Sequence, residues 1–332
     1  MKFDFITIGG ATEDMTFYTK DGVVVDNKKD ILRQKLLAFE YGAKLQVDKG
    51  YSTFGGGAAN AAVCLSLLGF KSAALVCVGD DNRGRSIISN LNQKGVDSSL
   101  VKIIPDNSSG FSFLIAGPQN EHVVFSYRAA NEKLDIISND LGKIKQTEWI
   151  YLTSLSGNWK KVLDKLFALG GVKIAWNPGH VQLHSGIKVL GKYFKKTEVL
   201  IVNKDEALEL AVSSGEYNRQ NDKYLEDVKN LLKIIKNWGP KIVVITRGKD
   251  GADVYDGISF YHQAIIKEKK RINTTGVGDA FGSTFSAGLK MFSGDIKKAM
   301  YMGVCNTASV VGSMGAQAGL LTKSEMMKRI KK

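Results

Sequence analysis

Short apolar runs alternate with longer amphipathic stretches over much of this chain. An apolar run such as 149–152 predicts a buried strand, whereas apolar positions repeating every three or four residues, as in 159–169, predict a helix. Strands separated by helices of this length form right-handed βαβ units, so the pattern predicts a mostly parallel sheet. Predicted strands cover residues 3–8, 73–78, 149–152, 172–176, 199–202 and 241–246, and predicted helices cover 159–169, 184–194, 224–238, 295–311 and 323–330.

The first part of the chain departs from this rhythm. Residues 16–25 and 44–53 alternate polar and apolar positions and predict strands, with a helix predicted over 30–41 between them. Residues 110–116 and 122–127 predict a hairpin, because a Gly-Pro-Gln-Asn sequence separates them. Together these segments predict a small separate sheet that acts as a lid.

Residues 272–282 predict a strand end, a glycine turn and the start of a helix, since Phe281, Phe285 and Leu289 follow at near-helical spacing. Gly276 and Gly278 lack a Cβ, so the backbone there can direct several N–H groups toward one point. The free N–H groups and the dipole of the first helical turn favour an anion at that point, and a phosphate suits it.

Asp279 lies in the first turn of this predicted helix. Two interpretations stay open: a surface acid that complements the helix dipole, or a general base that accepts a proton from a hydroxyl attacking a γ-phosphate. The flanking glycines favour the second, because they leave room for a substrate. No G-x-x-x-x-G-K-[ST] motif occurs in the chain, which excludes a Walker A loop.

The composition fits one large α/β domain with an appendage, given 332 residues of which 44% are hydrophobic. The formal net charge is +13, but the lysines are spread along the chain, with short clusters only at 267–271 and 328–332. Dispersed charge of this kind is typical of a solvated surface, so nucleic acid is not an expected partner.

Cys64, Cys77 and Cys305 each lie in an apolar context and predict small buried side chains in a reducing compartment. The N-terminus enters a strand without a signal-peptide pattern, and no apolar run approaches membrane-spanning length. We therefore expect a cytoplasmic protein with no membrane partner. His180 and His184 stand four residues apart, but no third ligand accompanies them in sequence, so a metal site there is not expected.

Several polar residues follow predicted strands. Asp14 comes shortly after strand 3–8. It is either an exposed loop acid or a carboxylate that accepts hydrogen bonds from two substrate hydroxyls. Residues 55–62, which include Asn60, open a helix with small residues, either for helix–sheet packing or to let a ligand approach the backbone. Arg128 ends the predicted hairpin and is either a solvated charge or a contact for a carboxylate or phosphate.

The run Asn273-Thr-Thr-Gly-Val-Gly-Asp279 resembles the C-terminal signature of the PfkB (ribokinase-like) family of carbohydrate and nucleoside kinases, usually written D-T-x-G-A-G-D. The resemblance implies that Asp279 is the catalytic base and that the amides of Gly276, Val277, Gly278 and Asp279 form the anion hole. Val277 replaces the usual Ala, and Asn273 replaces the usual Asp, which removes a charge where a monovalent cation would bind.

Residues 55–84 resemble the N-terminal signature of the same family. By that resemblance Gly56, Gly57 and Asn60 contact a sugar substrate and Asp14 holds its hydroxyls. Arg128 is a further candidate substrate contact, on its expected place at the mouth of the cleft and not by resemblance. The residues after strand 149–152 read Thr-Ser-Leu-Ser where the family often has an acid, so ribose itself is not specified.

The remaining resemblances concern the nucleotide. Asn203 and Glu206 match the family's N-x-x-E motif, which orders water around Mg²⁺, although the same two residues also form a capping-box pattern for a helix. Thr246, Gly248 and Gly251 match its T-x-G-x-x-G element beside the nucleotide. Thr275 and Asn306 are carried over as further cofactor contacts, Asn306 as part of the adenine wall.

These observations predict a single domain over residues 1–332 with a three-layer ribokinase-like α/β fold, a mostly parallel sheet between helices, and a β lid formed by roughly 15–53 and 110–128. The expected activity is transfer of the γ-phosphoryl group of ATP, with Mg²⁺, to a hydroxymethyl or other alcohol group of a sugar. A nucleoside kinase of the same family and a non-catalytic sugar sensor are the alternatives. If lid strands pair between chains, the protein is a homodimer.

Overall fold

The computed structural model describes residues 2–26, 35–116, 122–217, 222–267, 272 and 274–331. Its larger sheet has eight strands, in the order β16-β15-β14-β13-β12-β11-β1-β6. Six neighbouring strands, from β14 to β6, are parallel, and β15 and β16 are antiparallel. Its strands are β1 (Phe5–Ile8), β6 (Ser72–Leu75), β11 (Trp149–Leu152), β12 (Lys173–Trp176), β13 (Val199–Asn203), β14 (Ile242–Thr246), β15 (Ala252–Tyr255) and β16 (Phe260–Gln263).

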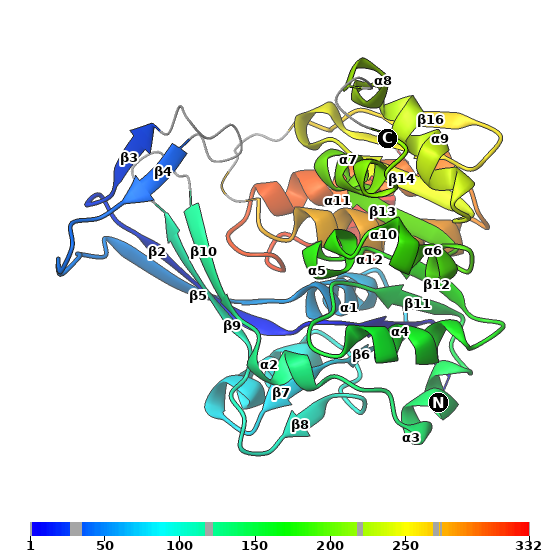
Figure 1. Ribbon diagram of the computed structural model, residues 1–332. Coiled ribbons are helices and arrows are strands. Elements are labelled where there is room, and N and C mark those ends of the chain that lie inside the picture. Colours follow the sequence, from blue (N-terminus) through cyan, green and yellow to red (C-terminus); the bar gives the residue numbers. More distant parts are fainter. Residues whose placement is uncertain are drawn as a thin grey trace.

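Helices cover both faces of this sheet (Figure 1). Alternate strand residues point to opposite faces, so Phe5 and Ile6 of β1 belong to two separate hydrophobic cores. Residues of α1 (Gly57–Leu67), α2 (Asn82–Gln93), α10 (Val277–Met291), α11 (Ile296–Val311) and α12 (Lys323–Ile330) build the first core. Residues of α3 (Ser138–Ile144), α4 (Trp159–Phe167), α5 (His180–His184), α6 (Ile187–Phe194), α7 (Lys204–Ser213), α8 (Asp222–Glu226) and α9 (Val228–Asn237) build the second.

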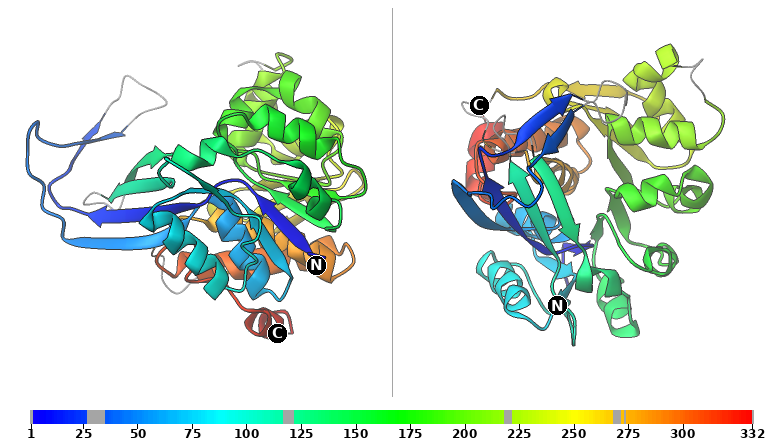
Figure 2. Two further views of the ribbon diagram at one scale, coloured as in Figure 1. Left: turned by 90° about the horizontal axis from the view of Figure 1, so that it is seen from below. Right: turned by 60° about the vertical axis from the view of Figure 1, so that its left-hand side comes forward.

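A second sheet, which has four strands, extends from the body of the molecule (Figure 1, Figure 2). Its order is β10-β9-β2-β5, from β10 (His122–Tyr127), β9 (Phe111–Ala116), β2 (Thr12–Tyr18) and β5 (Lys49–Gly55). A short pair, β3 (Val23–Asp26) with β4 (Lys35–Ala38), lies at its far end, and β7 (Cys77–Gly79) pairs with β8 (Lys102–Ile104) beside the main body. The predicted hairpin 110–127 is thus present in β9 and β10, while its turn at 117–120 lies outside the described residues.

The two faces of the second sheet differ in character. One face carries Asp14 and Tyr18 of β2 together with Ser112 of β9, and it faces the main body, because Tyr18 reaches Met314 and the Asp14 carboxylate is buried. Strand alternation places the aromatic side chains of the other strand positions on the opposite face. Those aromatic residues are Phe17, Phe111, Phe113, Phe125 and Tyr127.

The α/β prediction is confirmed, and so is the mostly parallel sheet between helices. Strand 149–152 and helix 323–330 have the predicted bounds. The helix predicted over 30–41 is wrong for residues 35–38, which form β4, and residues 30–34 lie outside the described residues. Because Lys35–Ala38 is short and finds a partner in β3, pairing between strands overrides its helical propensity. The strand predicted over 73–78 divides into β6 and β7, which pair in different sheets.

Candidate active site

Glycines bring the end of β1 against the start of α1. Gly56 is the N-cap of α1 with φ of 88°, a conformation that L side chains rarely adopt. A Cβ on Gly56 would lie 2.5 Å from the carbonyl oxygen of Gly10, just beyond the carboxyl end of β1. Only glycine therefore allows this contact, and it sets the first turn of α1 at the edge of the sheet where parallel α/β proteins bind ligands.

The first turn of α10 meets the first turn of α1 at this edge. Gly276 precedes α10 in a left-handed conformation, and a Cβ there would lie 2.3 Å from the Cβ of Ala316. Asp279 follows in the first turn, and its Oδ2 accepts a hydrogen bond of 2.9 Å from Nδ2 of Asn60 in α1. Gly57 lies beside them, since a Cβ on it would be 3.2 Å from Asp279 Oδ1. Two segments separated by more than half of the chain thus form one site.

Burial dominates the electrostatics of the two acids here. Desolvation raises the pKa of Asp279, the Asn60 hydrogen bond opposes this rise, and the nearby Asp14 carboxylate adds to it. Desolvation likewise raises the pKa of Asp14, against hydrogen bonds from Ser112 and Thr12 that lower it. Both acids hold protons more tightly than exposed carboxylates do, which suits proton acceptance from an alcohol.

The backbone amides beside Asp279 are available to an anion. Val277 N–H makes only a long bond of 3.5 Å to Thr274 O, whereas Ala280 N–H bonds Gly276 O at 2.9 Å in the regular helical pattern. Within the described part of the chain, the amides of Gly278 and Asp279 have no main-chain acceptor. The α10 N-terminus thus presents free donors and a positive dipole end next to a carboxylate.

Three predicted nucleotide contacts come together with the α10 N-terminus. Thr246, Gly248 and Gly251, which surround the short η3 helix (Gly248–Asp250), line a pocket of about 100 Å³. Gly251 requires glycine, because its φ is 84° and a Cβ would lie 2.1 Å from the Gln263 carbonyl oxygen. The other lining residues are Ile265, Val277, Gly278, Phe281, Val304 and Thr307.

Asn306 does not line this pocket, although it was predicted to form part of the adenine wall. It is fully buried, donates to Thr284 Oγ1 at 2.7 Å and accepts from Leu321 N–H at 2.9 Å. Its amide thus ties α11 to α10 and to the following loop. Val304 and Thr307, on another side of α11, face the pocket instead. Thr275 is half-buried directly before Gly276 and is not among the pocket-lining residues.

Asn203 and Glu206 form the capping box of α7 at the carboxyl end of β13. Asn203 Oδ1 accepts from Glu206 N–H, and Glu206 Oε2 accepts from Asn203 N–H, both at 2.8 Å. Desolvation raises the pKa of Glu206, with the Asn203 bond opposing the rise. The structure therefore contains the capping box that the sequence pattern predicts. The capping box leaves Glu206 Oε1 without a hydrogen bond to any described residue.

Arg128 does not line the pocket beside the α10 N-terminus. It is exposed at the start of the η1 helix (Ala129–Lys133), immediately after β10. Sequence reasoning missed its neighbour Asn131, whose side chain accepts from Ala11 N–H at 3.0 Å and donates to Ala11 O at 2.9 Å. That bidentate contact fixes the link between β1 and β2, and so the position of Asp14.

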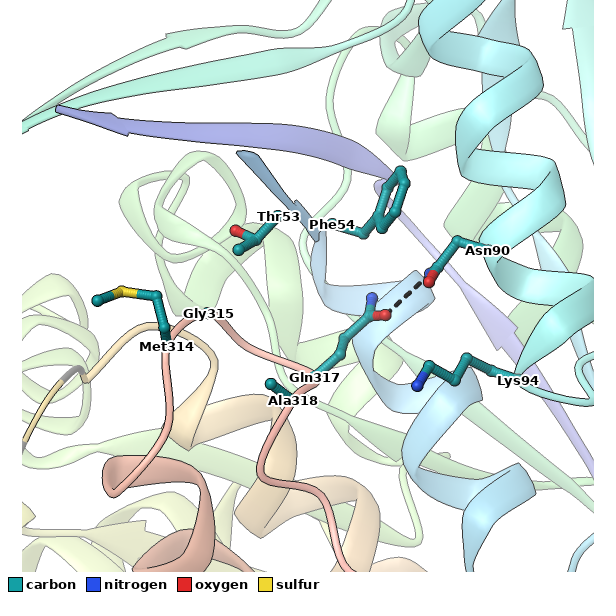
Figure 3. A pocket seen from close by; sticks show the side chains of 8 residues that line it. All are labelled: Thr53, Phe54, Asn90, Lys94, Met314, Gly315, Gln317 and Ala318. Atoms are coloured by element: carbon teal, nitrogen blue, oxygen red, sulfur yellow. Dashed lines mark hydrogen bonds between the residues drawn. The ribbon is translucent and has the colours of Figure 1, made fainter. Parts of the chain in front are cut away.

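A second pocket, of about 180 Å³, lies between Asn90 and Gln317 on one side and Thr53 and Met314 on the other (Figure 3). Gln317 on its wall donates from Nε2 to Asn60 Oδ1 at 3.0 Å, and Gln317 Oε1 accepts from Asn90 Nδ2 at 2.9 Å. Neither Gln317 nor Asn90 belongs to a motif that the sequence analysis recognised. The lining residues are Thr53, Phe54, Asn90, Lys94, Met314, Gly315, Gln317 and Ala318.

His180 and His184 are both exposed and approach Glu209 of α7, at 4.0 Å and 3.5 Å from their Nδ1 atoms. Among the described residues no cluster of histidine, cysteine or acidic side chains has the arrangement of a metal site. None of the helices that the described residues form has the length and apolar character needed to cross a membrane.

Comparisons with known proteins agree with this geometry. The sequence profile described as "pfkB family carbohydrate kinase" matches residues 23–323. An ATP-dependent ribose-1-phosphate kinase from Halopiger xanaduensis is 26% identical over 266 residues, covering 80% of this chain and 82% of that protein. A structure of Arabidopsis thaliana ribokinase complexed with ribose and ATP superimposes with a TM-score of 0.82, full coverage of both chains and 17% identity. Methanocaldococcus jannaschii nucleoside kinase gives a TM-score of 0.78, 99% coverage of both chains and 21% identity.

Proposed function

The chain belongs to the pfkB family of carbohydrate kinases, and we propose that it transfers the γ-phosphoryl group of ATP to a hydroxymethyl or other alcohol group of a sugar, as a ribokinase or fructokinase does. It is a phosphotransferase with an alcohol group as acceptor, and at the coarser level a sugar or nucleoside kinase. The finer assignment, to a sugar acceptor, is the proposal.

One observation carries this proposal. The Asp279 carboxylate, bonded to Asn60 at 2.9 Å, lies where the N-termini of α1 and α10 meet, next to backbone amides without main-chain acceptors. A kinase needs these parts together: a base for the attacking hydroxyl and fixed donors for the charge on the transferred phosphoryl group.

In the proposed reaction Asp279 takes the proton of the acceptor hydroxyl as its oxygen attacks the γ-phosphorus. The bond from the γ-phosphorus to the bridging oxygen breaks, and ADP leaves with that electron pair. The amides of Gly276, Val277, Gly278 and Asp279 donate to the phosphoryl oxygens during transfer, and the raised pKa of Asp279 favours proton acceptance.

The acceptor would lie between the α1 N-terminus and the second sheet. Asp14, whose side chain is buried, would hold a pair of hydroxyls, and Gly56, Gly57 and Asn60 would contact the same molecule. Arg128 is exposed at the end of β10 and would contact a charged substituent. A relative named for ribose-1-phosphate and a structural neighbour holding ribose support a ribose-type acceptor.

For the nucleotide, Thr246, Gly248 and Gly251 would line the base and sugar side of the ATP site with Thr307, and Thr275 would reach the phosphates. Asn203 and Glu206 would hold hydrated Mg²⁺, because Glu206 keeps one carboxylate oxygen free of described partners and Mg²⁺ retains several waters. When bound, Mg²⁺ offsets the charge of the β- and γ-phosphates.

We further propose that residues 1–332 form one domain in which the second sheet, from roughly 15–53 and 110–128, is a lid over the acceptor. The buried Asp14 on its body-facing side supports this role. The aromatic outer face of the sheet supports a homodimer formed through the lid. Three buried free cysteines support a cytoplasmic location.

A nucleoside acceptor is the second candidate, and one observation favours it. Tyr18 and Tyr51 form an edge-to-face pair, with ring centroids 6.0 Å apart, on the body-facing side of the lid sheet. Aromatic rings at that place would stack on a nucleobase, whereas a free sugar offers no flat ring for them.

An acceptor screen separates the two candidates. ADP release is measured with ATP, Mg²⁺ and, in turn, ribose, fructose, ketodeoxygluconate, adenosine, inosine and cytidine. Turnover of a free sugar that survives Tyr18→Ala supports the sugar kinase, whereas turnover of a nucleoside whose KM rises about tenfold or more in that variant supports the second candidate. Equal turnover by wild type and Asp279→Asn would reject the proposed base in either case.

A further inference from the structure

A chain of three amide side chains runs from the surface of α2 to Asp279. Asn90 Nδ2 donates to Gln317 Oε1 at 2.9 Å, Gln317 Nε2 donates to Asn60 Oδ1 at 3.0 Å, and Asn60 Nδ2 donates to Asp279 Oδ2 at 2.9 Å. Gln317 and Asn60 are 8% and 4% exposed, so bulk water does not compete for these bonds. We call these three residues the amide chain; Figure 3 shows its outer bond, between Asn90 and Gln317.

The amide chain has one direction, with every donor pointing toward the carboxylate. A side-chain amide has a donor end and an acceptor end, so the partner at one end decides which end faces the other. Gln317 occupies the carbonyl of Asn60 as a donor, and this leaves the amino group of Asn60 to face Asp279. An ionised carboxylate can only accept, so this orientation matches the ionised acid.

We propose that Gln317 and Asn90 are positioning residues, which hold the amide of Asn60 in the orientation that keeps Asp279 ionised and ready to accept a proton. The inference rests on the proposed function of Asp279 as the base. Gln317 lies in the loop after α11, and Asn90 lies in α2. Two elements outside the reaction centre therefore influence the protonation state of Asp279 through the hydrogen bonds that lead to Asn60.

The alternative orientation shows what the amide chain prevents. If Asn60 turned its amide over, its carbonyl would face Asp279 and would accept a hydrogen bond only from a protonated carboxyl. That arrangement favours the neutral acid, which cannot act as a base. The other titratable groups that face Asp279 are Asp14 on β2, Cys64 on α1 and Tyr151 on β11, and none of them belongs to the amide chain.

Asn90 allows this idea to be tested from a distance. An Asn90→Asp side chain can only accept, so Gln317 would turn its amino group outward and its carbonyl toward Asn60. Asn60 would then donate to Gln317 and present its carbonyl to Asp279. Lys94, four residues after Asn90 and directly after the end of α2, lies on the same pocket wall and would pair with the new carboxylate, so the helix should remain stable.

Asn92→Asp is the matched control, because Asn92 is an exposed residue of the same helix and the change adds the same charge. Gln317→Met removes the two bonds of Gln317 without adding charge. For each variant, kcat/KM is measured against pH with the acceptor found in the screen. The pKa of Asp279 is also measured by ¹³C NMR of labelled aspartate carboxyls, with Asp279→Asn giving the assignment.

We expect Asn90→Asp and Gln317→Met to raise the midpoint of the acid limb by about 1 pH unit, which is about a tenfold loss of activity below it, with little change on the alkaline plateau. Asn92→Asp should follow wild type. The carboxyl titration should shift by the same amount and requires no turnover. Unshifted NMR titrations in Asn90→Asp and Gln317→Met would overturn the amide chain, even if Asp279→Asn abolishes activity. Conversely, an active Asp279→Asn enzyme with shifted titrations would reject the proposed base alone.

Discussion

Asp279 is an acid in an unfavourable place for a charge. Desolvation raises its pKa, and the neighbouring Asp14 carboxylate raises it further. One hydrogen bond, from Asn60, partly offsets this cost. Strained or desolvated groups of this kind persist where function requires them, so the residue should lower stability while it supports activity.

Replacing Asp279 by its amide tests how much the carboxylate contributes to activity. Asp279→Asn keeps the shape of the side chain but cannot accept a proton from the acceptor hydroxyl. We expect kcat to fall by about 10²- to 10⁴-fold, the usual contribution of a general base, with little change in the KM for ATP. Steady-state ADP release measures both constants, and a loss in kcat below tenfold would argue against a role in proton transfer.

The same variant tests how much the carboxylate lowers the free energy of unfolding. Because the folded protein holds the Asp279 proton more tightly than the unfolded chain does, this group lowers stability as the pH rises from about 4, the ordinary pKa of aspartate, through the raised pKa of the folded state. Asp279→Asn should therefore be more stable than wild type at pH 7, and the difference should disappear toward pH 4. Urea unfolding at several pH values measures this, with Asp48→Asn, at an exposed acid, as the control for lost charge.

For single residues in the candidate site, the sequence predicts the residue types but not their hydrogen-bond partners. The glycine-rich run before α10 indicates Asp279 as a candidate base, yet nothing local indicates that Asn60 bonds to it. Nothing in the sequence indicates Gln317 or Asn131, since a single amide in a loop or a one-turn helix carries no periodic or spacing signal. The resemblance assigns Asn306 to the nucleotide, whereas the structure shows it buried and bonded to Thr284 of α10.

Among the elements, the helix pair α10 and α11 positions the segment that carries Asp279. The two helices approach closely because Gly288 of α10 faces Ala299 of α11, where an added Cβ would lie 2.6 Å from the Ala299 Cα. Phe285, fully buried between the helices and the sheet, fixes the same helix from another side. The position of the Asp279 turn therefore depends on packing along the whole length of α10.

Two glycine-to-alanine substitutions distinguish the effect of this helix packing on stability from the effect of helix propensity. Gly288→Ala should destabilise the fold by about 1–3 kcal/mol, because the new methyl group overlaps the backbone of α11. Gly142→Ala adds the same group to an exposed position of α3 with nothing within 4 Å, and should stabilise by up to about 1 kcal/mol. Urea midpoints compare them, and equal midpoints would mean that the two helices pack less closely than the Gly288–Ala299 contact requires.

Predictions for elements succeed where a segment is long or fully buried. The strand Trp149–Leu152 lies in the centre of the sheet between two layers of helices, so its apolar run is unambiguous. Residues 35–38 form a strand at the far end of the second sheet, partly exposed and short, where periodicity cannot separate a helix from a strand. The division of 73–78 between two sheets follows from long-range pairing with β1 and β8, which no local pattern encodes.

For the whole molecule, the second sheet is the feature that the main body leaves partly uncovered. Its strands extend beyond the helices (Figure 2), and its outer face is rich in aromatic side chains. Phe17 stacks on Phe113 with centroids 6.0 Å apart, while Phe125 and Tyr127 on the edge strand β10 are 57% and 52% exposed. Aromatic faces of this kind on soluble proteins usually meet a partner.

A second copy of the chain is the partner we propose, and mass measurement tests it. Light scattering after gel filtration should give about twice 36.3 kDa. Phe125→Asp places a charge in the proposed interface, where burying it costs several kcal/mol, so the dimer should dissociate at micromolar concentration. Val124→Asp is the matched control, because this neighbouring residue is 49% exposed but lies on the body-facing side of the same strand, opposite Leu114. A monomeric wild type, or equal dissociation by both variants, would contradict an interface on the aromatic face, since only Phe125 belongs to it.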